Sequence, residues 1–395
     1  GLRPQARKLC REILKAAAGH GGAHYLLGLM DLAEGQPRSA ARHLRRALDA
    51  TPGVLPPLLA LARAEAAQGR RSVAQDLYAQ VLATAPDLAA AHVELATLRL
   101  AAGEREAAAE GYRRALALDD RQPEAHNNLG NLQREAGAIA AALVHLRRAV
   151  ALRPDWAAAH GNLGVALTQA GERDAAALCF ARAIELKPDH AASHANLAAL
   201  LLDFKRADAA LPHAERAAAI ERHDAGIHLT LGQTRRAMGD RDGAAAAFEK
   251  AARLDPGLAA ARFQRGDLAR EAGDTTAARH WFGEALARDP EDRLGTALVL
   301  AAMGVAEAPA RAPDAYVREL FDQYADRFDH ALVETLEYRA PALIRAALDQ
   351  TGGGNALAVL DVGCGTGLLA LEVRAMAARL DGVDLSPRMV AKAAE

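Results

Sequence analysis

A repeat of 34 residues constrains this chain more than any other feature. Residues 123–156 align with residues 157–190 without a gap, and the same register covers residues 21–292, which makes eight consecutive units. One position is alanine in every unit: Ala40, Ala74, Ala108, Ala142, Ala176, Ala210, Ala244 and Ala278. A period of this length indicates one small unit stacked many times, so the chain should fold as an array and not around a single core.

Each unit reads as two helices with a break between them. Glycine lies midway in seven units, after an amphipathic stretch such as 124–136, and glycine can take the left-handed conformation that ends a helix. A second helix such as 139–152 is then stopped by proline in six units. The eighth residue is always Gly or Ala, which lets the two helix axes approach closely. About a quarter of the chain is alanine, and this packing requirement accounts for much of it.

The pattern resembles the tetratricopeptide repeat, with small residues at places 8, 20 and 27 and proline at place 32. The resemblance implies an all-α superhelical solenoid in which the first helices line a concave surface. We expect this solenoid over residues 1–304, as a half repeat at 1–20, eight repeats at 21–292 and a capping helix at 293–304. Residues 2–19 correspond to the second helix of a further unit, so we expect the array to have been cut at its N-terminus.

Histidine takes the place that is usually tryptophan in this family, at His24, His92, His126, His160, His194 and His228. Packed helices lie about 10 Å apart. Two histidines of successive units are therefore too distant to share a metal ion with bonds of about 2 Å. We expect no metal site, and expect each histidine to be a half-buried packing residue with its polar tip satisfied.

Three successive units carry asparagine at their sixth place, Asn128, Asn162 and Asn196. An asparagine side chain offers a donor and an acceptor, so it can pair with a peptide backbone whatever the peptide sequence. The arrangement resembles the asparagine ladder of the O-linked N-acetylglucosamine transferases. With Asn127 and Asn131 these residues predict a groove that binds a protein or peptide. The alternative is that asparagine at this place has no ligand.

Composition excludes several other partners. The formal net charge is −2 with 25% charged residues, which argues against binding to nucleic acid. No run of 18 apolar residues occurs, so no membrane span is expected. Three cysteines, Cys10, Cys179 and Cys364, lie far apart without a CxxC pair, which favours a reducing compartment. We therefore expect a cytoplasmic location, in a bacterial cell.

The repeat ends after residue 304, and residues 305–354 read as a linker followed by helices. Residues 306–313 are rich in Ala and Pro. Residues 314–328 predict a helix, and residues 330–347 predict one further helix or a pair. Residues 352–354 form a flexible glycine break. The first of these helices carries aromatic and apolar residues at helical spacing: Tyr316, Leu320, Phe321, Tyr324 and Phe328.

The last 40 residues carry the chemistry. Residues 356–362 predict a strand that includes Asp361, followed by a glycine-rich turn, a helix over 368–380, and a second strand that ends at Asp384. This order of elements is typical of the beginning of a nucleoside-binding α/β fold. The glycines let a ligand approach the backbone, and an aspartate after the second strand can accept hydrogen bonds from both ribose hydroxyls.

The third glycine comes one place too early for an NAD fingerprint. The string Asp-x-Gly-x-Gly-x-Gly, followed by Gly-Val-Asp-Leu-Ser, resembles motifs of the class I S-adenosylmethionine-dependent methyltransferases. The resemblance implies a Rossmann-like domain and S-adenosyl-L-methionine as cofactor. The residues implied to bind it are Asp361, Gly363, Gly365, Gly367, Asp384 and Ser386, with Met389 also near the adenine.

The aromatic segment before the strand resembles the leading helices of bacterial fusions of tetratricopeptide repeats with methyltransferases. This resemblance implies that the aromatic segment folds over the cofactor as a lid, with Tyr316 and Tyr324 as candidate contacts or else as core residues of the lid helix. Cys364 is not expected to be a nucleophile, because methyl transfer from a sulfonium is a direct displacement that depends on the placement of the two substrates.

We expect residues 355–395 to be only the N-terminal part of a methyltransferase domain, so this fragment should be inactive, and its catalytic residues and methyl acceptor stay unknown. Its one or two strands should be loosely ordered or propped against the preceding helices. The predicted function is a methyltransferase fused to a peptide-binding array. The alternative is an interaction scaffold without catalysis. A sugar transferase, suggested by the likeness of the repeats, disagrees with the C-terminal motif.

Overall fold

The computed structural model describes residues 2–325, 328–350 and 356–394. The chain divides into two compact units, Gly1–Ser193 and His194–Glu395, and each is described by itself. Pairs of helices fill the first unit and most of the second, and a two-stranded parallel sheet lies near the C-terminal end. The fold is a tetratricopeptide-type array followed by the start of a Rossmann-like α/β segment. The domain boundaries expected at residues 304 and 354 stay predictions.

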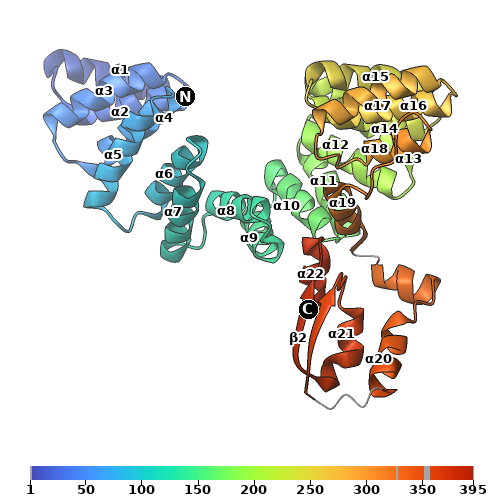
Figure 1. Cartoon of the computed structure of the whole chain (residues 1–395). Coiled ribbons are helices and arrows are strands. Elements are labelled where there is room, and N and C mark those ends of the chain that lie inside the picture. Colours follow the sequence, from blue (N-terminus) through green and yellow to red (C-terminus); the bar gives the residue numbers. More distant parts are fainter. Residues whose placement is uncertain (1, 326–327, 351–355, 395) are drawn as a thin grey trace. The chain divides into compact units, whose positions relative to one another are not determined.

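Eleven helices are described in the first unit, coloured blue to green in Figure 1. They are α1 (Leu2–Ala16), α2 (Gly21–Ala33), α3 (Pro37–Ala50), α4 (Leu55–Ala67), α5 (Arg71–Thr84), α6 (Ala89–Ala101), α7 (Arg105–Leu118), α8 (Pro123–Glu135), α9 (Ile139–Leu152), α10 (Ala157–Gln169) and α11 (Arg173–Leu186).

The second unit continues the pairs and ends in mixed structure. Its helical pairs are α12 (Ala191–Asp203) with α13 (Ala207–Ile220), α14 (Ala225–Ala237) with α15 (Arg241–Leu254), and α16 (Ala259–Glu271) with α17 (Thr275–Arg288). Then follow α18 (Thr296–Ala302), α19 (Asp314–Tyr324), η2 (His330–Thr335), α20 (Ala340–Gln350), β1 (Leu357–Val362), α21 (Leu368–Val373), η3 (Arg374–Met376), β2 (Ala377–Val383) and α22 (Pro387–Ala393).

The first helix of a repeat ends where the sequence places its glycine. After α8, Gly137 has a φ of +81° and its N–H donates to the carbonyl of Arg134, while Ala138 N–H donates to Gln133. These two bonds define a Schellman cap, which satisfies carbonyls that the helix leaves open. Lys205 takes the same position after α12 with a φ of +59°, so a residue with a side chain is held in the left-handed region there.

The core of the array lies between the two helices of each repeat and against the next repeat. The small residue at place 8 faces a large one at place 24 in every repeat except the sixth, where both places are alanine, Ala198 and Ala214. In the fifth repeat, a Cβ added to Gly164 would lie 2.6 Å from Phe180, a ring that is 1% exposed. Glycine and alanine are therefore required here by the width of the facing side chain.

A short helix closes the repeats. α18 spans Thr296–Ala302, inside the capping helix expected at 293–304. It begins three residues later than expected because Asp292 and Gly295, with φ of +51° and +66°, form a turn first. The carboxylate of Asp292 accepts the N–H groups of Thr296 and Ala297, two donors that the first turn of a helix leaves open.

The helix expected over residues 368–380 is wrong in its second half. α21 ends at Val373, a single 3-10 turn follows to Met376, and β2 begins at Ala377. β2 pairs in parallel with β1, so that Asp361 lies opposite Gly382. The residues 377–380 are good helix formers, but helix propensity is worth only tenths of a kcal/mol per residue and the pairing with β1 overrides it.

The other expectations for the C-terminal region are met in part. The helix expected over 314–328 is described as α19 up to Tyr324, and residues 326–327 lie outside the described residues, as does the break at 352–354. The region 330–347 holds a short π-helix, η2, and α20. On β1, Leu360 and Val362 are 63% and 76% exposed, so one face of the small sheet is uncovered. Among the described residues, no helix is long and apolar enough to cross a membrane.

Candidate functional site

The glycine-rich turn lies at the carboxyl ends of both strands. Gly363, Gly365 and Gly367 have φ values of +80°, +52° and +87°, which side chains disfavour. The N–H groups of Gly363 and Cys364 both donate to the carbonyl of Val383, at 2.8 and 3.1 Å, so the turn is tied to the end of β2. In open α/β sheets this edge is where ligands bind.

Asp384 joins the turn to the loop after β2. One carboxylate oxygen accepts the N–H of Gly365 at 3.0 Å, and the other accepts the N–H of Ser386 at 2.9 Å. Each oxygen of an ionised carboxylate has a further lone pair. Asp384 is thus held in place by the backbone and can still accept hydrogen bonds from a ligand.

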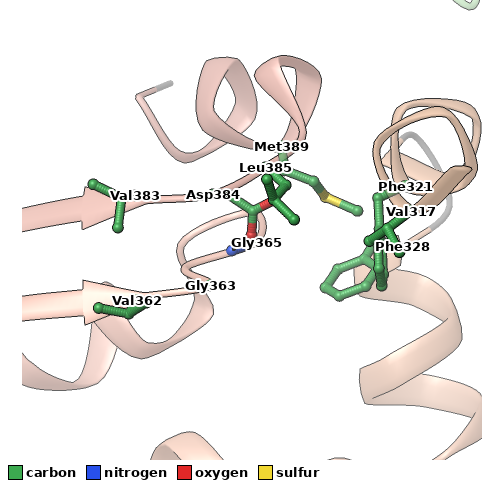
Figure 2. A pocket seen from close by; sticks show the side chains of 10 residues that line it. All are labelled: Val317, Phe321, Phe328, Val362, Gly363, Gly365, Val383, Asp384, Leu385 and Met389. Atoms are coloured by element: carbon green, nitrogen blue, oxygen red, sulfur yellow. Dashed lines mark hydrogen bonds between the residues drawn. The ribbon is translucent and has the colours of Figure 1, made fainter. Parts of the chain in front are cut away.

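A cavity of about 570 Å³ opens between the strand ends and the segment that contains α19. Figure 2 shows Val317, Phe321 and Phe328 facing Leu385 and Met389 across it, with Asp384 near its floor. Pockets of 300–1,000 Å³ with mainly apolar walls and few polar groups are typical of sites for small molecules and cofactors. The arrangement suits a ligand with flat apolar surface and a hydroxyl-bearing edge.

The structure brings some of the predicted cofactor residues to this cavity. Among the described residues, Gly363, Gly365, Asp384 and Met389 line it.

Gly367, Ser386 and Asp361 do not line the cavity among the described residues. Gly367 is packed against Ala393 of α22, where an added Cβ would meet the alanine Cβ at 3.2 Å. Ser386 is fully buried, and its hydroxyl accepts the N–H of Met389 as the N-cap of α22. Asp361 is the last residue but one of β1. Burial and, to a lesser degree, the charge of Asp384 raise the pKa of its carboxyl group.

The aromatic wall comes from other residues than the two tyrosines that were singled out. Tyr316 lies against Gly295, whose added Cβ would be 2.7 Å from the tyrosine ring, and Tyr324 is 41% exposed. The cavity is lined by Phe321 and Phe328, whose ring centroids are 6.1 Å apart in an edge-to-face arrangement. Residues three to four apart share a helix face, so Val317 joins Phe321 while its neighbour Tyr316 points elsewhere.

Two aspartates near the cavity were not foreseen. Asp322 accepts the hydroxyl of Ser386 and, at 3.2 Å, the N–H of Arg388. Asp329 accepts the hydroxyl of Thr366, inside the glycine turn. The signal in the sequence was the dipeptide Phe-Asp, which occurs at 321–322 and again at 328–329.

Cys364 has the surroundings of a packing residue. Burial, followed by the charges of Asp384 and Asp361, raises the pKa of its thiol. Its sulfur would be 3.0 Å from a Cβ added to Gly382, so the thiol fills the space between the turn and β2. A thiol with a raised pKa is a poor nucleophile, in keeping with the expectation from the sequence.

The asparagines of the fourth and fifth repeats form a linked chain. Asn127 Nδ2 donates to Asn128 Oδ1 at 3.0 Å, and Asn162 Nδ2 donates to Asn127 Oδ1 at 2.8 Å. Asn128 Nδ2 in turn donates to the hydroxyl of Tyr112 at 3.0 Å. Asn127 is buried, whereas Asn128, Asn131 and Asn162 are partly exposed. The amides therefore hold one another in fixed orientations across two repeats.

A second cavity, of about 560 Å³, lies beside this chain of asparagines in the first unit. Asn128 lines it together with Tyr78, Glu94 and Arg63. Glu94 accepts the tyrosine hydroxyl at 2.6 Å and forms an ion pair with Arg63. Asn196 belongs to the second unit, where it is partly exposed.

The repeat histidines are satisfied packing residues, as expected, and most are more deeply buried than expected. His24 and His126 are 1% and 4% exposed, and their Nε2 atoms lie 3.0 Å from the carbonyls of Ala18 and Asp120. Their Nδ1 atoms lie 2.9 Å from the Nδ1 atoms of further histidines, an arrangement that the sequence did not suggest. The pairs are His24–His43, His126–His145 and His194–His213. Among the described residues, no group of three or more His, Cys, Asp or Glu side chains could hold a metal ion.

Comparison with known proteins supports both parts of the fold. A family model described as a methyltransferase domain matches residues 359–395. Models of the tetratricopeptide repeat match residues 93–159, 157–190 and 229–293. The chain therefore contains tetratricopeptide repeats in the matched ranges. It also carries, at its C-terminal end, a segment of a methyltransferase domain.

Individual relatives cover only parts of the chain. The human protein named methyltransferase-like protein 27 is 45% identical over 76 residues, which is 18% of this chain and 31% of that protein. The crystal structure of the APC/C hetero-tetramer Cut9–Hcn1 has a TM-score of 0.52 at 20% identity, covering 58% of this chain and 46% of that chain. A tetratricopeptide repeat protein from Parabacteroides merdae has a TM-score of 0.46 at 19% identity, covering 60% and 93%. This chain thus spans less than a third of the human relative and less than half of the Cut9–Hcn1 chain.

Proposed function

We propose that this protein is a class I methyltransferase that uses S-adenosyl-L-methionine, and that its repeats bind a protein or peptide. The proposal divides the chain into the array at 1–304, connecting helices at 305–354 and a methyltransferase segment at 355–395. The observation that carries it is the cavity at the strand ends, where Gly363, Gly365 and Asp384 line one side. The match to a methyltransferase domain over residues 359–395 supports it.

The residues present fit this cofactor. Asp384 has two fixed oxygens with spare lone pairs, which suits the two ribose hydroxyls. Gly365 leaves the backbone bare beside the cavity. Asp361, in the last part of β1, is proposed to hold the amino end of the methionine part from the edge of the site. Leu385 and Met389 offer an apolar surface for the adenine. When bound, the cofactor supplies a methyl group on a sulfonium, ready for direct displacement.

Gly367 and Ser386 act on the site indirectly in this proposal. Gly367 allows α22 to pack closely on the turn, and Ser386 fixes the start of α22, which carries Met389. Gly367 and Ser386 thus determine the shape of the two loops, and the loops in turn position the reactants.

The test is cofactor binding by the intact protein, measured by calorimetry. The wild type should bind S-adenosylmethionine, and Asp384→Ala should weaken binding at least about ten-fold, because hydrogen bonds to a charged group contribute about 1.5–3 kcal/mol. Asp381→Ala is the matched control, since this exposed aspartate of β2 pairs only with Arg379 among the described residues and should bind as wild type does. No binding by the wild type rejects the enzyme and leaves the interaction scaffold.

We further propose that Asn128, Asn131 and Asn162 of the first unit contact the backbone of a bound peptide, and that the buried Asn127 orients its two neighbours. Asn196 is proposed to make the same kind of contact in the second unit. The support is that the Oδ1 of Asn162 makes no hydrogen bond within the described part of the chain, while its Nδ2 is fixed by Asn127. A fixed amide with a spare acceptor binds a peptide N–H with little loss of side-chain entropy.

Loss of the ladder tests this second part. A peptide selected from a random library on the wild-type protein should bind the triple variant Asn128→Ala, Asn162→Ala, Asn196→Ala at least about ten-fold more weakly, since each hydrogen bond contributes about 0.5–1.5 kcal/mol. Fluorescence anisotropy measures the affinity, and circular dichroism checks that the helices persist. Unchanged affinity would show that the asparagines are not a peptide site.

All three cysteines are free thiols, which supports the cytoplasmic location that forms part of the proposal.

A further inference from the structure

The dipeptide Phe-Asp occurs twice beside the cavity, at 321–322 and at 328–329. In both copies the phenylalanine lines the cavity. In both copies the aspartate that follows it hydrogen-bonds to a loop of the proposed cofactor site. The same arrangement thus occurs twice, seven residues apart. In each copy the aspartate fixes the position of the phenylalanine that lines the cavity.

The first copy is attached to the loop after β2. The carboxylate of Asp322 accepts the hydroxyl proton of Ser386 and the N–H of Arg388. Ser386 is fully buried, and its own N–H donates to Asp384. Because the serine hydroxyl has a single proton and already accepts the N–H of Met389, that proton is directed at Asp322. Asp322 is therefore linked through one buried serine to the residue that faces the cavity.

The second copy is attached to the glycine turn. The carboxylate of Asp329 accepts the hydroxyl of Thr366, which lies between Gly365 and Gly367. The ring of Phe328 lies close to the same turn, since a Cβ added to Gly365 would be 3.2 Å from it. The two aspartates thus bond to two neighbouring loops, the glycine turn after β1 and the loop after β2, which both line the cavity.

We propose that Asp322 and Asp329 are positioning residues that latch α19 and residues 328–329 onto the methyl-donor site, so that Phe321 and Phe328 complete its wall. This proposal rests on the proposed function of the cavity. Release of the latch would withdraw the two rings and would also free Ser386, and with it one of the two hydrogen bonds that orient Asp384. The affinity for the donor is then controlled by residues that do not touch it.

Hydrogen exchange tests the latch without any cofactor. In the intact wild-type protein, the amides of Ser386 and of residues 388–393 should be protected, and Asp322→Ala should raise their exchange rates at least about ten-fold, since it removes two bonds to a charged acceptor. Asp322→Asn keeps an oxygen that accepts both donors and should restore most of the protection. Glu319→Ala, an exposed position of the same helix that bonds to Gln323, is the control and should exchange as wild type does.

Donor binding provides the second measurement. Calorimetry with S-adenosylmethionine should show affinity lowered about ten-fold in Asp322→Ala and largely restored in Asp322→Asn. Unchanged exchange in Asp322→Ala overturns the latch, whatever the donor does. Faster exchange in Asp322→Ala combined with unchanged donor affinity also overturns it. Absence of donor binding in the wild type, with the exchange pattern as expected, rejects the proposed function of the cavity and leaves the attachment of the segment standing.

Discussion

Replacement of Gly164 by alanine should destabilise the array, although alanine is the better helix former. A Cβ at this position would lie 2.6, 2.8 and 2.9 Å from three ring atoms of Phe180. Ordinary carbon contacts are about 3.5–4.0 Å, so the ring would have to retreat by about 1 Å. Phe180 is 1% exposed and has no free space to enter. Overpacking of this kind costs about 1–3 kcal/mol, against a helix gain of about 0.5–1 kcal/mol, so the midpoints of the two ranges leave a net loss of about 1 kcal/mol.

The same substitution should have the opposite sign at Gly283. This glycine lies within α17, has no atom within 4 Å of an added Cβ, and is exposed. Gly283→Ala should therefore stabilise the protein by about 0.5–1 kcal/mol through helix propensity alone. The pair of variants separates a packing effect from a backbone effect, because the chemical change is identical.

Urea denaturation followed by circular dichroism gives the shift in midpoint, and hydrogen exchange assigns it to α10 and α11. Local exchange is needed because repeat arrays unfold in parts. In a Phe180→Ala background the obstacle is gone, so Gly164→Ala should become stabilising as Gly283→Ala is. Two results would refute this reasoning: Gly164→Ala is as stable as the wild type, or it loses the same stability in the Phe180→Ala background. The size of the side chain at place 24 would then not explain the small residue at place 8.

Two further predictions follow from side chains in strained or buried positions. Burial, and then the charge of His126, lowers the pKa of His145. The unfolded chain binds this proton near pH 6.5, so the stability from this group is present above about pH 6.5 and is lost as pH falls toward the lowered pKa. Thermal denaturation between pH 7.5 and 5.5 measures the loss, and His145→Gln should reduce the slope; an unchanged slope would exclude the pair as its source. Lys205→Gly should raise the urea midpoint by the equivalent of about 1 kcal/mol, because the left-handed conformation is costly for a residue with a side chain; a lower midpoint would show that the lysine side chain contributes more than the strain.

The array could be predicted from the sequence because its signals repeat. α9 begins and ends at the residues expected, Ile139 and Leu152. Any single glycine or proline is a weak signal, but a break that recurs at one place in most of eight units fixes both the helix type and its ends. Where one unit departs, as at Lys205, the neighbouring repeats still impose the turn.

The histidine pairs show what periodicity alone does not supply. His126 was expected to have a satisfied polar tip, and its Nε2 does face the carbonyl of Asp120. An Nε2–H that donates to a carbonyl leaves Nδ1 as an acceptor. A donor must then be found, and His145 at place 23 supplies it across the helix pair. The second histidine was visible in the sequence, but only the packing of the two helices makes it a partner.

The candidate site was predicted where its chemistry is local and missed where it depends on tertiary contacts. Asp384 and the glycines follow from a short motif whose backbone geometry is set within a few residues. The aromatic wall of the cavity does not follow from a local motif. A helix such as α19 has aromatic residues on two faces, and its sequence does not say which face meets the cavity. The hydrogen bonds of Asp322 determine which face of α19 meets the cavity, because its carboxylate binds the start of α22. Phe321, one residue before, is thereby turned toward Met389, while Tyr316 is left against Gly295. The polar residue next to an aromatic one therefore indicates which ring lines the site, because the hydrogen bond fixes the rotation of the helix that both share.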